Sequence, residues 1–249
     1  MLKSIYFFFL ALFCFSCTQH YIPPQVTALH TEKPSFSKPS PSMERAPQGA
    51  SRQEAIAKHP LSKPYTIVID AGHGGKDPGT VSKKNDYEEK KLTLSTAIML
   101  QGYLKNLGYH TILTRDEDVF IPLGTRAQIA NNKRADLFVS LHYNHSPSYD
   151  IQGVEVYFYQ EGGGMRTASS RKLGELVLNR VVRNTGAESR GTKKGNFAVI
   201  RETKMPAILV ECGYLSHAKE RIKIKDPHYR QQIAMGIAKG IDSYLCSKG

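Results

Sequence analysis

The stretch Tyr65-Thr-Ile-Val-Ile-Asp-Ala-Gly-His-Gly-Gly75 passes from an apolar run into a cluster of glycines. A short run rich in β-branched residues and ended by glycines is typical of a buried strand that enters a tight loop. His73 lies inside that loop. Such a loop would also suit phosphate binding, but neither Gly-x-Gly-x-x-Gly nor Gly-Lys-Ser/Thr follows, which argues against nucleotide binding.

Downstream of this loop, apolar runs alternate with amphipathic segments. Residues 89–107 have the spacing of a helix with one apolar face, and Gly108 ends it. This alternation predicts a single α/β domain over residues 63–249, with a mainly parallel, mixed sheet flanked by helices. The other expected strands cover residues 109–114, 136–142 and 153–159, and helices are expected around residue 126 and over 167–184 and 227–245. A Gly- and Lys-rich loop precedes two further segments, 197–201 and 207–211.

Three polar residues stand at the ends of runs that are otherwise suited to burial. His73 follows the first strand, His142 ends Leu-Phe-Val-Ser-Leu-His, and Glu211 ends Ala-Ile-Leu-Val-Glu. In open α/β sheets the ligand crevice lies beyond the carboxyl ends of the strands. A carboxylate that ends an apolar strand is costly unless it is paired or functional. We therefore expect the three side chains to meet in one crevice.

Two imidazoles need a third protein ligand to form a catalytic zinc site, in which the fourth position stays open. Glu88 and Glu89 open the first long helix, so either carboxylate is a candidate for the third ligand. Glu211 would then remain free to carry a proton between water and a leaving amine. The sequence thus predicts one zinc ion per chain, at the carboxyl ends of the strands, and a metal-assisted amide hydrolysis.

The first residues predict export. Lys3 precedes an apolar stretch of the length of a signal-peptide core, too short to span a bilayer. A small residue directly before Cys17 is the mark of a bacterial lipoprotein cleavage site. We predict a signal peptide over residues 1–16, acylation of Cys17 and a periplasmic, membrane-anchored lipoprotein.

Residues 17–62 have a different composition from the rest of the chain. They are rich in Pro and Ser and lack apolar periodicity, so they cannot bury enough surface to offset their ordering entropy. We predict a disordered tether between the lipid anchor and the catalytic domain. Only Cys212 and Cys246 lie in that domain, and we expect both to be buried free thiols rather than a disulfide.

The charge balance indicates a polyanionic partner or surface. The formal net charge is +12 and the sequence pI is about 9.5. No aromatic-interleaved basic stripe or RNA-binding signature accompanies this charge, so we expect no nucleic-acid partner. Attraction to an anionic cell wall accounts for the charge equally well.

The motifs around these candidate residues resemble those of the zinc-dependent type 3 family of bacterial N-acetylmuramoyl-L-alanine amidases. They occur in order from residue 64 to 249. They comprise Ile67-Val-Ile-Asp-Ala-Gly-His-Gly-Gly-Lys-Asp-Pro-Gly79, Glu89-Lys90, Leu113-Thr-Arg115, Arg126 with Ala130-Asn131, Ala135-Asp-Leu-Phe-Val-Ser-Leu-His-Tyr-Asn144, Gly153-Val-Glu155 and Pro206-Ala-Ile-Leu-Val-Glu-Cys-Gly-Tyr-Leu-Ser216.

The resemblance implies zinc held by His73, Glu89 and His142, with Glu211 as the catalytic glutamate. Glu89 is preferred over Glu88 because the family's ligand directly precedes a lysine. The bond implied is the amide between N-acetylmuramic acid and the L-Ala of the peptidoglycan stem peptide, cut for wall remodelling, septum splitting or turnover. Within the same motifs we expect Arg115 and Asn144 to contact substrate.

Two other functions remain open alternatives. Ser35-Phe-Ser-Lys38 and Ser169-Ser-Arg-Lys172 match the Ser-x-x-Lys pattern of penicillin-binding enzymes, which would give an additional serine-type D-Ala carboxypeptidase activity. A non-catalytic, peptidoglycan-binding lipoprotein is the second alternative. Between residues 159 and 167 the chain is too short for an inserted helix that could block the site, so we expect no obligatory activator.

Overall fold

The computed structural model describes residues 65–81 and 87–248. The predicted signal peptide (1–16), the acylation of Cys17 and the predicted tether (17–62) lie outside these residues. Within the described part of the chain, no helix is both long and apolar enough to cross a membrane.

A six-stranded mixed sheet forms the centre of the domain. The strand order is β2-β1-β3-β6-β4-β5, and all neighbouring pairs are parallel except β4 and β6, which are antiparallel. This confirms the predicted α/β class with a mainly parallel sheet. The strands are β1 (Thr66–Ala71), β2 (His110–Leu113), β3 (Leu137–Asn144), β4 (Val154–Phe158), β5 (Ser189–Lys194) and β6 (Ala207–Tyr214).

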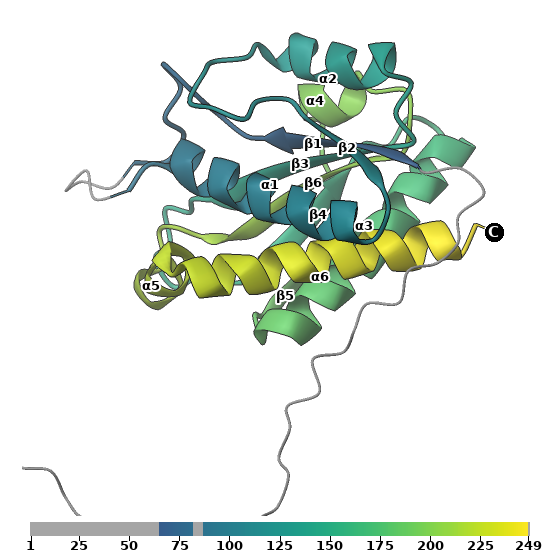
Figure 1. The fold of residues 1–249 in the computed structure, drawn as a ribbon. Helices are drawn as coiled ribbons and strands as arrows, with labels where there is room; N and C mark the ends of the chain where they lie inside the picture. The colour runs from purple at the N-terminus through teal and green to yellow at the C-terminus, as the bar shows by residue number, and fades with distance from the viewer. Residues whose placement is uncertain (1–64, 82–86, 249) are drawn as a thin grey trace, which may run out of the picture. The chain divides into compact units, whose positions relative to one another are not determined.

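Helices cover the two faces of this sheet unequally (Figure 1). The long helices α1 (Glu89–Asn106), α3 (Met165–Thr185) and α6 (Pro227–Cys246) lie on one face, with the short α5 (Ala218–Lys225) beside them. The shorter α2 (Leu123–Asn132) and α4 (Ala198–Arg201) lie on the other face. The larger apolar core accordingly fills the space under the three long helices, and a smaller one lies under α2 and α4.

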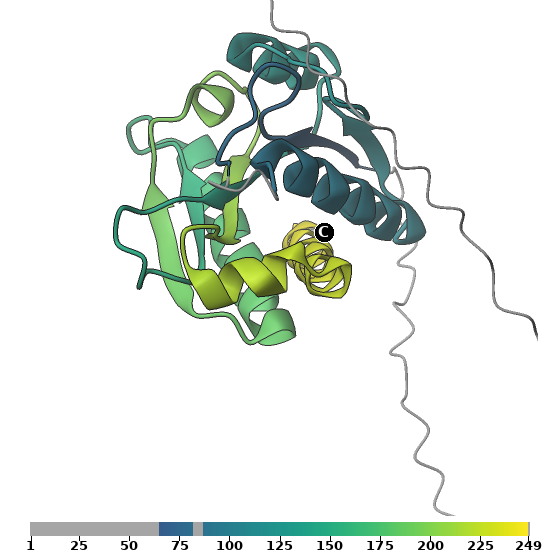
Figure 2. The ribbon, with the colours of Figure 1, turned by 90° about the vertical axis from the view of Figure 1, so that its left-hand side faces the viewer.

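Two glycines of α6 allow that helix to pack directly against α3. A Cβ atom on Gly240 would lie 2.5 Å from the Cα of Val177, and one on Gly236 would lie 2.7 Å from the Cα of Val181. The two glycines are four residues apart, so they share one face of the helix. The close packing of α6 against α3 therefore requires glycine, which has no side chain, at these two positions (Figure 2).

Three local predictions need correction. The Gly- and Lys-rich segment forms β5 instead of a loop, since it pairs with β4 at the sheet edge, where charged side chains are tolerated. The helix α5 was not predicted, because its sequence is mostly charged and has little apolar periodicity. Both Cys212 and Cys246 are free thiols as expected, but only Cys212 is buried and Cys246 is exposed.

Candidate functional site

The candidate residues come from four different elements that end or begin at one edge of the sheet. His73 follows β1 in the glycine loop, and His142 lies on β3 opposite Glu211 on the neighbouring β6. Glu89 is the first residue of α1 and is 3% exposed. Parallel strands bring their carboxyl ends to the same edge, so residues more than 130 positions apart become neighbours.

Three of these side chains form a compact cluster of potential metal ligands. His73, Glu89 and His142 each offer one atom within 4.8 Å of the others. Oε1 of Glu89 lies 3.1 Å from Nε2 of His73 and 3.2 Å from Nδ1 of His142. No other such group of three or more His, Cys, Asp or Glu residues occurs in the described part of the chain.

The cluster fits a zinc ion in donor type and spacing. Two imidazole nitrogens and one carboxylate oxygen are a common ligand set for catalytic zinc, with metal–ligand distances of about 2.0–2.2 Å. Two such ligands on a tetrahedron lie about 3.3 Å apart, close to the two distances from Glu89. The separation of these donor atoms therefore suits one ion between them.

Glycines bring the backbone close to the ligand side chains. A Cβ atom on Gly72 would lie 2.4 Å from Cε1 of His142, and one on Gly79 would lie 2.7 Å from both His73 and Glu89. His73 itself has a φ of 62°, a left-handed conformation that is uncommon for residues other than glycine. The absence of a side chain at Gly72 and Gly79 thus lets the loop pack tightly around the cluster.

Hydrogen bonds orient the ligands. Oδ2 of Asp77 lies 2.8 Å from Nδ1 of His73, which leaves Nε2 of that ring facing the cluster. Thr80 donates its backbone N–H to Oε2 of Glu89, and Tyr143 donates its backbone N–H to Oε1. Such contacts behind metal ligands fix ring orientation and ligand geometry.

The pKa directions indicate a site suited to positive charge. Burial opposes protonation of His142, but the hydrogen bond and charge of Glu89 outweigh it and raise the pKa of His142 to about 9. The pKa of His73 is also raised, against the effect of burial, mainly by Glu89. Although burial would raise the pKa of Glu89, hydrogen bonds from both histidines lower it. The carboxylate of Glu89 thus favours positive charge at the two imidazoles, and a metal ion bound to the deprotonated rings would supply that charge in place of the protons.

Glu211 lies beside the cluster without belonging to it. Its Oε2 is buried and has no hydrogen-bond partner among the described residues. Burial, with smaller contributions from the carboxylates of Glu89 and Glu155 against the opposing effect of His142, raises the pKa of Glu211 to about 7. A carboxylate with a pKa near neutrality can both accept and release a proton at physiological pH.

Glu88 points elsewhere. It is the residue before α1, and its carboxylate lies 2.6 Å from Nζ of Lys91 and 4.0 Å from Nζ of Lys90. The choice between the two adjacent glutamates therefore agrees with the geometry, since only Glu89 belongs to the cluster.

Arg115 lies buried between the glycine loop and α1. It is 3% exposed, and its guanidinium donates to the backbone carbonyls of Ala71, Gly72, Glu117 and Lys90. These bonds hold the glycine loop against α1. Arg115 thus shapes the loop, and its expected contact with substrate stays a prediction.

Asn144 also has internal partners. Its Nδ2 donates to Oε1 of Glu155 at 2.7 Å, and its Oδ1 accepts from the backbone N–H of His145. Glu155 is 1% exposed and lies directly opposite Glu211 across the β4–β6 pair. Sequence reasoning gave Glu155 no role, although a charged residue within the apolar strand Val-Glu-Val was a signal that could have singled it out.

A second pair of charged residues holds the loop after β1. Arg126 of α2 and Asp70 of β1 are buried, with Nη1 2.9 Å from Oδ1. Arg126 also donates to the backbone carbonyls of Ala71 and His73. This buried pair connects the covering helix α2 to the loop that carries His73.

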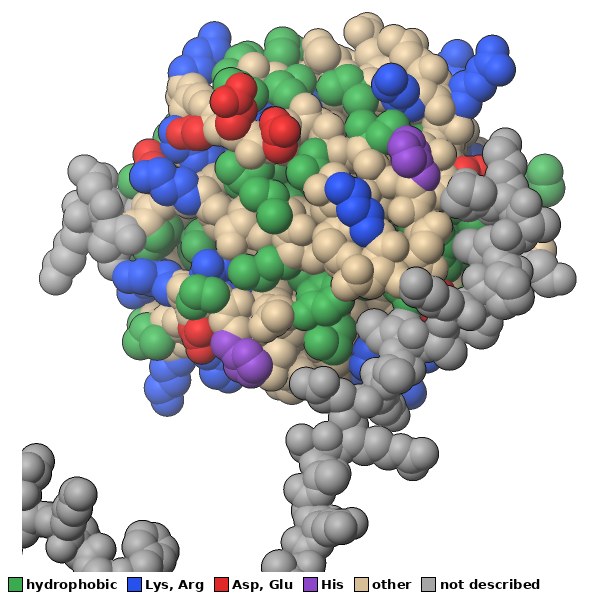
Figure 3. Space-filling model, viewed as in Figure 1, with side chains coloured by type: hydrophobic (Ala, Val, Ile, Leu, Met, Phe, Trp, Pro, Cys, Tyr) green, Lys and Arg blue, Asp and Glu red, His purple; other side chains and the backbone are tan. Residues whose placement is uncertain are grey.

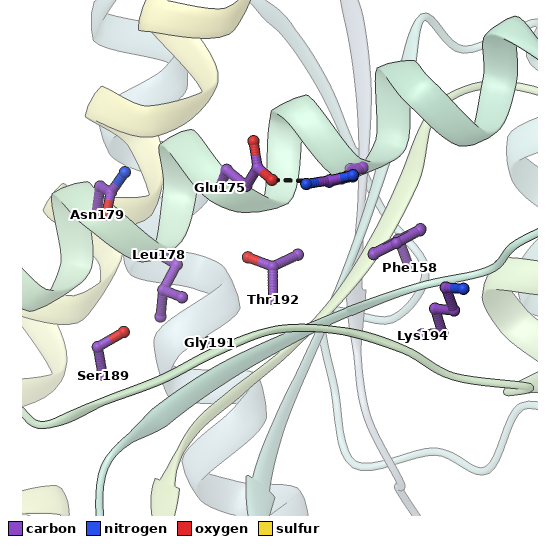
Figure 4. A pocket seen from close by; sticks show the side chains of 9 residues that line it. Phe158, Glu175, Leu178, Asn179, Ser189, Gly191, Thr192 and Lys194 are labelled. Atoms are coloured by element: carbon purple, nitrogen blue, oxygen red, sulfur yellow. Dashed lines mark hydrogen bonds and ion pairs between the residues drawn. The ribbon is translucent and has the colours of Figure 1, made fainter.

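A cavity lies between α3 and β5 (Figure 4), and none of the residues that line it belongs to the ligand cluster. It has a volume of about 410 Å³ and is lined by residues such as Phe158, Glu175 and Lys194. Val156 on β4 contacts the α3 side at Gly174, so its neighbour Glu155 points to the opposite face. The cavity thus lies on the sheet face covered by α3, opposite the face that carries Glu211.

Comparison with known proteins agrees with this geometry. Residues 67–243 match the family model described as N-acetylmuramoyl-L-alanine amidase. The N-acetylmuramoyl-L-alanine amidase AmiC of Neisseria meningitidis is 34% identical over 72% of this chain, which spans only 52% of that relative. The Bacillus subtilis protein YqiI is 35% identical over 72% of this chain and 84% of its own length.

Solved structures show the same fold. An N-acetylmuramoyl-L-alanine amidase from Clostridium difficile 630 has a TM-score of 0.72 at 39% identity and matches 76% of this chain and all of its own. The CwlD amidase of Clostridioides difficile, solved in complex with the GerS lipoprotein, has a TM-score of 0.69 at 28% identity over 74% of this chain and 99% of its own. With the family model matched over most of the chain, this protein belongs to the N-acetylmuramoyl-L-alanine amidase family.

Proposed function

We propose that this protein is a zinc-dependent N-acetylmuramoyl-L-alanine amidase. It would hydrolyse the amide between the lactyl group of N-acetylmuramic acid and the L-Ala of the stem peptide in peptidoglycan. The observation that carries the proposal is the cluster of His73, Glu89 and His142 with Glu211 on the adjacent strand. Membership of the amidase family supports the choice of substrate.

The side chains divide the chemistry between them. Zinc, when bound by His73, Glu89 and His142, supplies Lewis-acid polarisation of the scissile carbonyl. Glu211 accepts a proton from the attacking water and delivers it to the leaving nitrogen, so that the amine departs neutral. The pKa of Glu211, about 7, suits both transfers.

The proposed reaction is tested by digesting purified peptidoglycan and identifying the new ends by mass. We expect a free amino terminus on L-Ala and a free lactyl carboxyl on muramic acid, loss of this cleavage with chelator and its return with zinc. Penicillin-sensitive release of D-Ala would instead indicate the serine carboxypeptidase alternative. Binding to peptidoglycan without any new ends would indicate a non-catalytic lipoprotein.

We also propose that the enzyme acts without an activator. Only residues 159–164 separate β4 from α3, too few to form a blocking helix and return. The relative CwlD was solved with a lipoprotein partner, so a partner requirement is the competing hypothesis. Zinc-loaded protein that cuts muropeptides only after a second protein is added would contradict our proposal.

The proposed location is the periplasm, with the chain anchored to a membrane through an acylated Cys17. Attachment close to the wall would suit an enzyme of wall remodelling, septum splitting or turnover. Cys17→Ala should preserve export and move the protein from the membrane fraction to the soluble fraction. An unchanged distribution would mean that another part of the chain holds it at the membrane.

A further inference from the structure

A polar surface adjoins Glu211 on the face of β4 and β5 that α3 does not cover. Glu155 faces this side of β4, and Lys193 of the edge strand β5 reaches it with an ion pair. Tyr157, on the same face of β4, packs edge-on against Phe197, with ring centroids 5.1 Å apart. The family assignment does not explain why these groups gather beside the catalytic glutamate.

Glu155 is surrounded by more donors than a structural ion pair requires. Its Oε1 accepts hydrogen bonds from Asn144 at 2.7 Å and from the hydroxyls of Tyr157 and Tyr214, each at 2.9 Å. Its Oε2 accepts from Lys193. Although burial would raise the pKa of Glu155, these donors lower it, so the carboxylate is ionised. Glu155 therefore fixes the position of Lys193 relative to β4 and β6.

The two cations on β5 outnumber this carboxylate. Arg190 lies with Nε 3.8 Å from Oε2 of Glu155, beyond hydrogen-bond reach, and this buried Nε has no hydrogen-bond partner among the described residues. The Lys193 side chain is 40% exposed, and an ammonium group has three donors, of which Glu155 takes one. Arg190 and Lys193 thus exceed Glu155 by one positive charge, and Lys193 keeps donors that suit an anion.

The separation between the Lys193 ammonium group and Glu211 corresponds to one or two residues of an extended peptide substrate. Neighbouring strands lie about 4.8 Å apart, and the ammonium group reaches from β5 to Glu155 on β4, the strand next to Glu211. One extended residue spans about 3.3–3.6 Å. An ammonium group at this place is therefore within one or two residues of an amide held at Glu211.

We propose that Lys193, positioned by Glu155, binds a carboxylate of the stem peptide one or two residues beyond the scissile amide. This inference rests on the proposed amidase function. In a muropeptide the amino sugars are neutral once the lactyl group is amidated, so the acidic groups lie on the peptide side. Lys193 is then a specificity-determining residue, and Glu155 is a positioning residue.

The test compares two muramoyl dipeptides that differ in one group. In one substrate the residue after L-Ala carries a free carboxylate, and in the other that carboxylate is amidated. Lys193→Met should raise KM for the acid about tenfold, as expected for loss of one charge-assisted hydrogen bond, and should change KM for the amide less than twofold. Lys193→Arg should restore much of the preference for the acid.

Lys194 provides a matched control on the same strand. Its side chain lines the cavity under α3 (Figure 4), so Lys194→Met removes the same charge from the opposite face. It should leave KM for both substrates unchanged. Equal losses on acid and amide in Lys193→Met, or no loss on either, would overturn the proposal.

Binding measurements separate this inference from the proposed function. Calorimetry with the Glu211→Gln variant measures the affinity of both dipeptides without turnover, with Lys193→Met in the same background as the comparison. A preference for the acid that disappears with Lys193 supports the inference. If wild-type protein cleaves neither substrate, the amidase proposal fails, while the binding comparison still decides whether Lys193 recognises a carboxylate.

Discussion

The two faces of β4 and β6 have opposite chemistry although they belong to the same strands. Val156 and Val210 lie opposite each other on one face and are fully buried in the core under the long helices. Glu155 and Glu211 lie opposite each other on the other face, beside the ligand cluster. Because side chains alternate along a strand, one pair of strands contributes both to the core and to the two carboxylates beside the ligand cluster.

The difference shows how rigidity is supplied to the site. Under α3 and α6, β4 and β6 present apolar side chains such as Val154, Val156, Ile208 and Val210. On their other face they present carboxylates whose positions depend on hydrogen bonds and on the backbone. A substitution on the covered face should therefore change stability, and one on the open face should change chemistry or metal binding. On the face of the molecule shown in Figure 3, Lys and Arg side chains are scattered over the surface.

The largest effect is expected when one of the three metal ligands is replaced. His73→Ala and Glu89→Ala should each lower zinc content to background and abolish amide hydrolysis, because two remaining ligands cannot form a catalytic zinc site. Metal analysis of the purified variants measures this. Glu88→Ala is the control and should retain zinc, since Glu88 pairs with Lys91 outside the cluster. Zinc loss in Glu88→Ala with retention in Glu89→Ala would reverse the assignment.

A smaller effect is expected from Glu211→Gln on the open face. This change removes a proton carrier but no ligand, so the rate should fall by about 10²- to 10⁴-fold. Zinc content should remain at the wild-type level. A parallel fall in zinc content and rate would make Glu211 a ligand and contradict the division of roles.

A change on the covered face should alter stability alone. In Gly240→Ala the new Cβ would lie 2.5 Å from the Cα of Val177, so α6 must move, at a cost of about 1–3 kcal/mol. Gly102 on α1 has no atom within 4 Å of such a Cβ, and Gly102→Ala should stabilise by about 0.5–1 kcal/mol. Denaturant unfolding measures both. The contrast between faces fails if Gly240→Ala loses zinc while its stability is unchanged.

The smallest expected effect is a pH dependence of stability. The pKa of Glu211 is about 7 in the folded protein, against an ordinary value of 4.5. The folded state therefore binds the proton more tightly than the unfolded state, and stability falls as pH rises from 4.5 to 7. In chelator-treated protein, Glu211→Gln removes this loss, so its Tm should exceed that of wild type by a few degrees at pH 8 and by less at pH 5.

Thermal melts at the two pH values decide this point. A Tm advantage of Glu211→Gln that is larger at pH 5 than at pH 8 would show that the sign of the shift is wrong. An advantage of equal size at both values would show that Glu211 titrates at its ordinary pKa.

Much of the fold was predictable because its signals are local. The run before Gly72 forms β1, and the apolar spacing after Glu89 forms α1 with nearly the expected bounds. β5 was not predictable, since Ser-Arg-Gly-Thr-Lys-Lys has no apolar alternation and becomes a strand through its pairing with β4. Helix α5 was not predictable either, because its sequence is mostly charged and contains few buried apolar residues such as Ile224.

The residues of the candidate site also fall into a group that the sequence predicted and a group that it did not. His73, His142 and Glu211 were recognisable because a polar residue at the end of an apolar strand has a cost that function explains. The choice between Glu88 and Glu89 was open from the residues themselves, because adjacent positions at a helix start point in different directions. The positions of Arg115 and Asn144 depend on partners from distant segments, which no local pattern encodes.

The sequence by itself thus determined the class of fold, the order of most elements and the kinds of side chain available for metal binding and proton transfer. Only the tertiary structure decided which of them meet, such as Glu89 with two histidines and Glu155 with Lys193. The physical reason is that strand formation depends on neighbouring residues, whereas the distance between two side chains depends on sheet order. Here β6 lies between β3 and β4, which places Glu211 between His142 and Glu155.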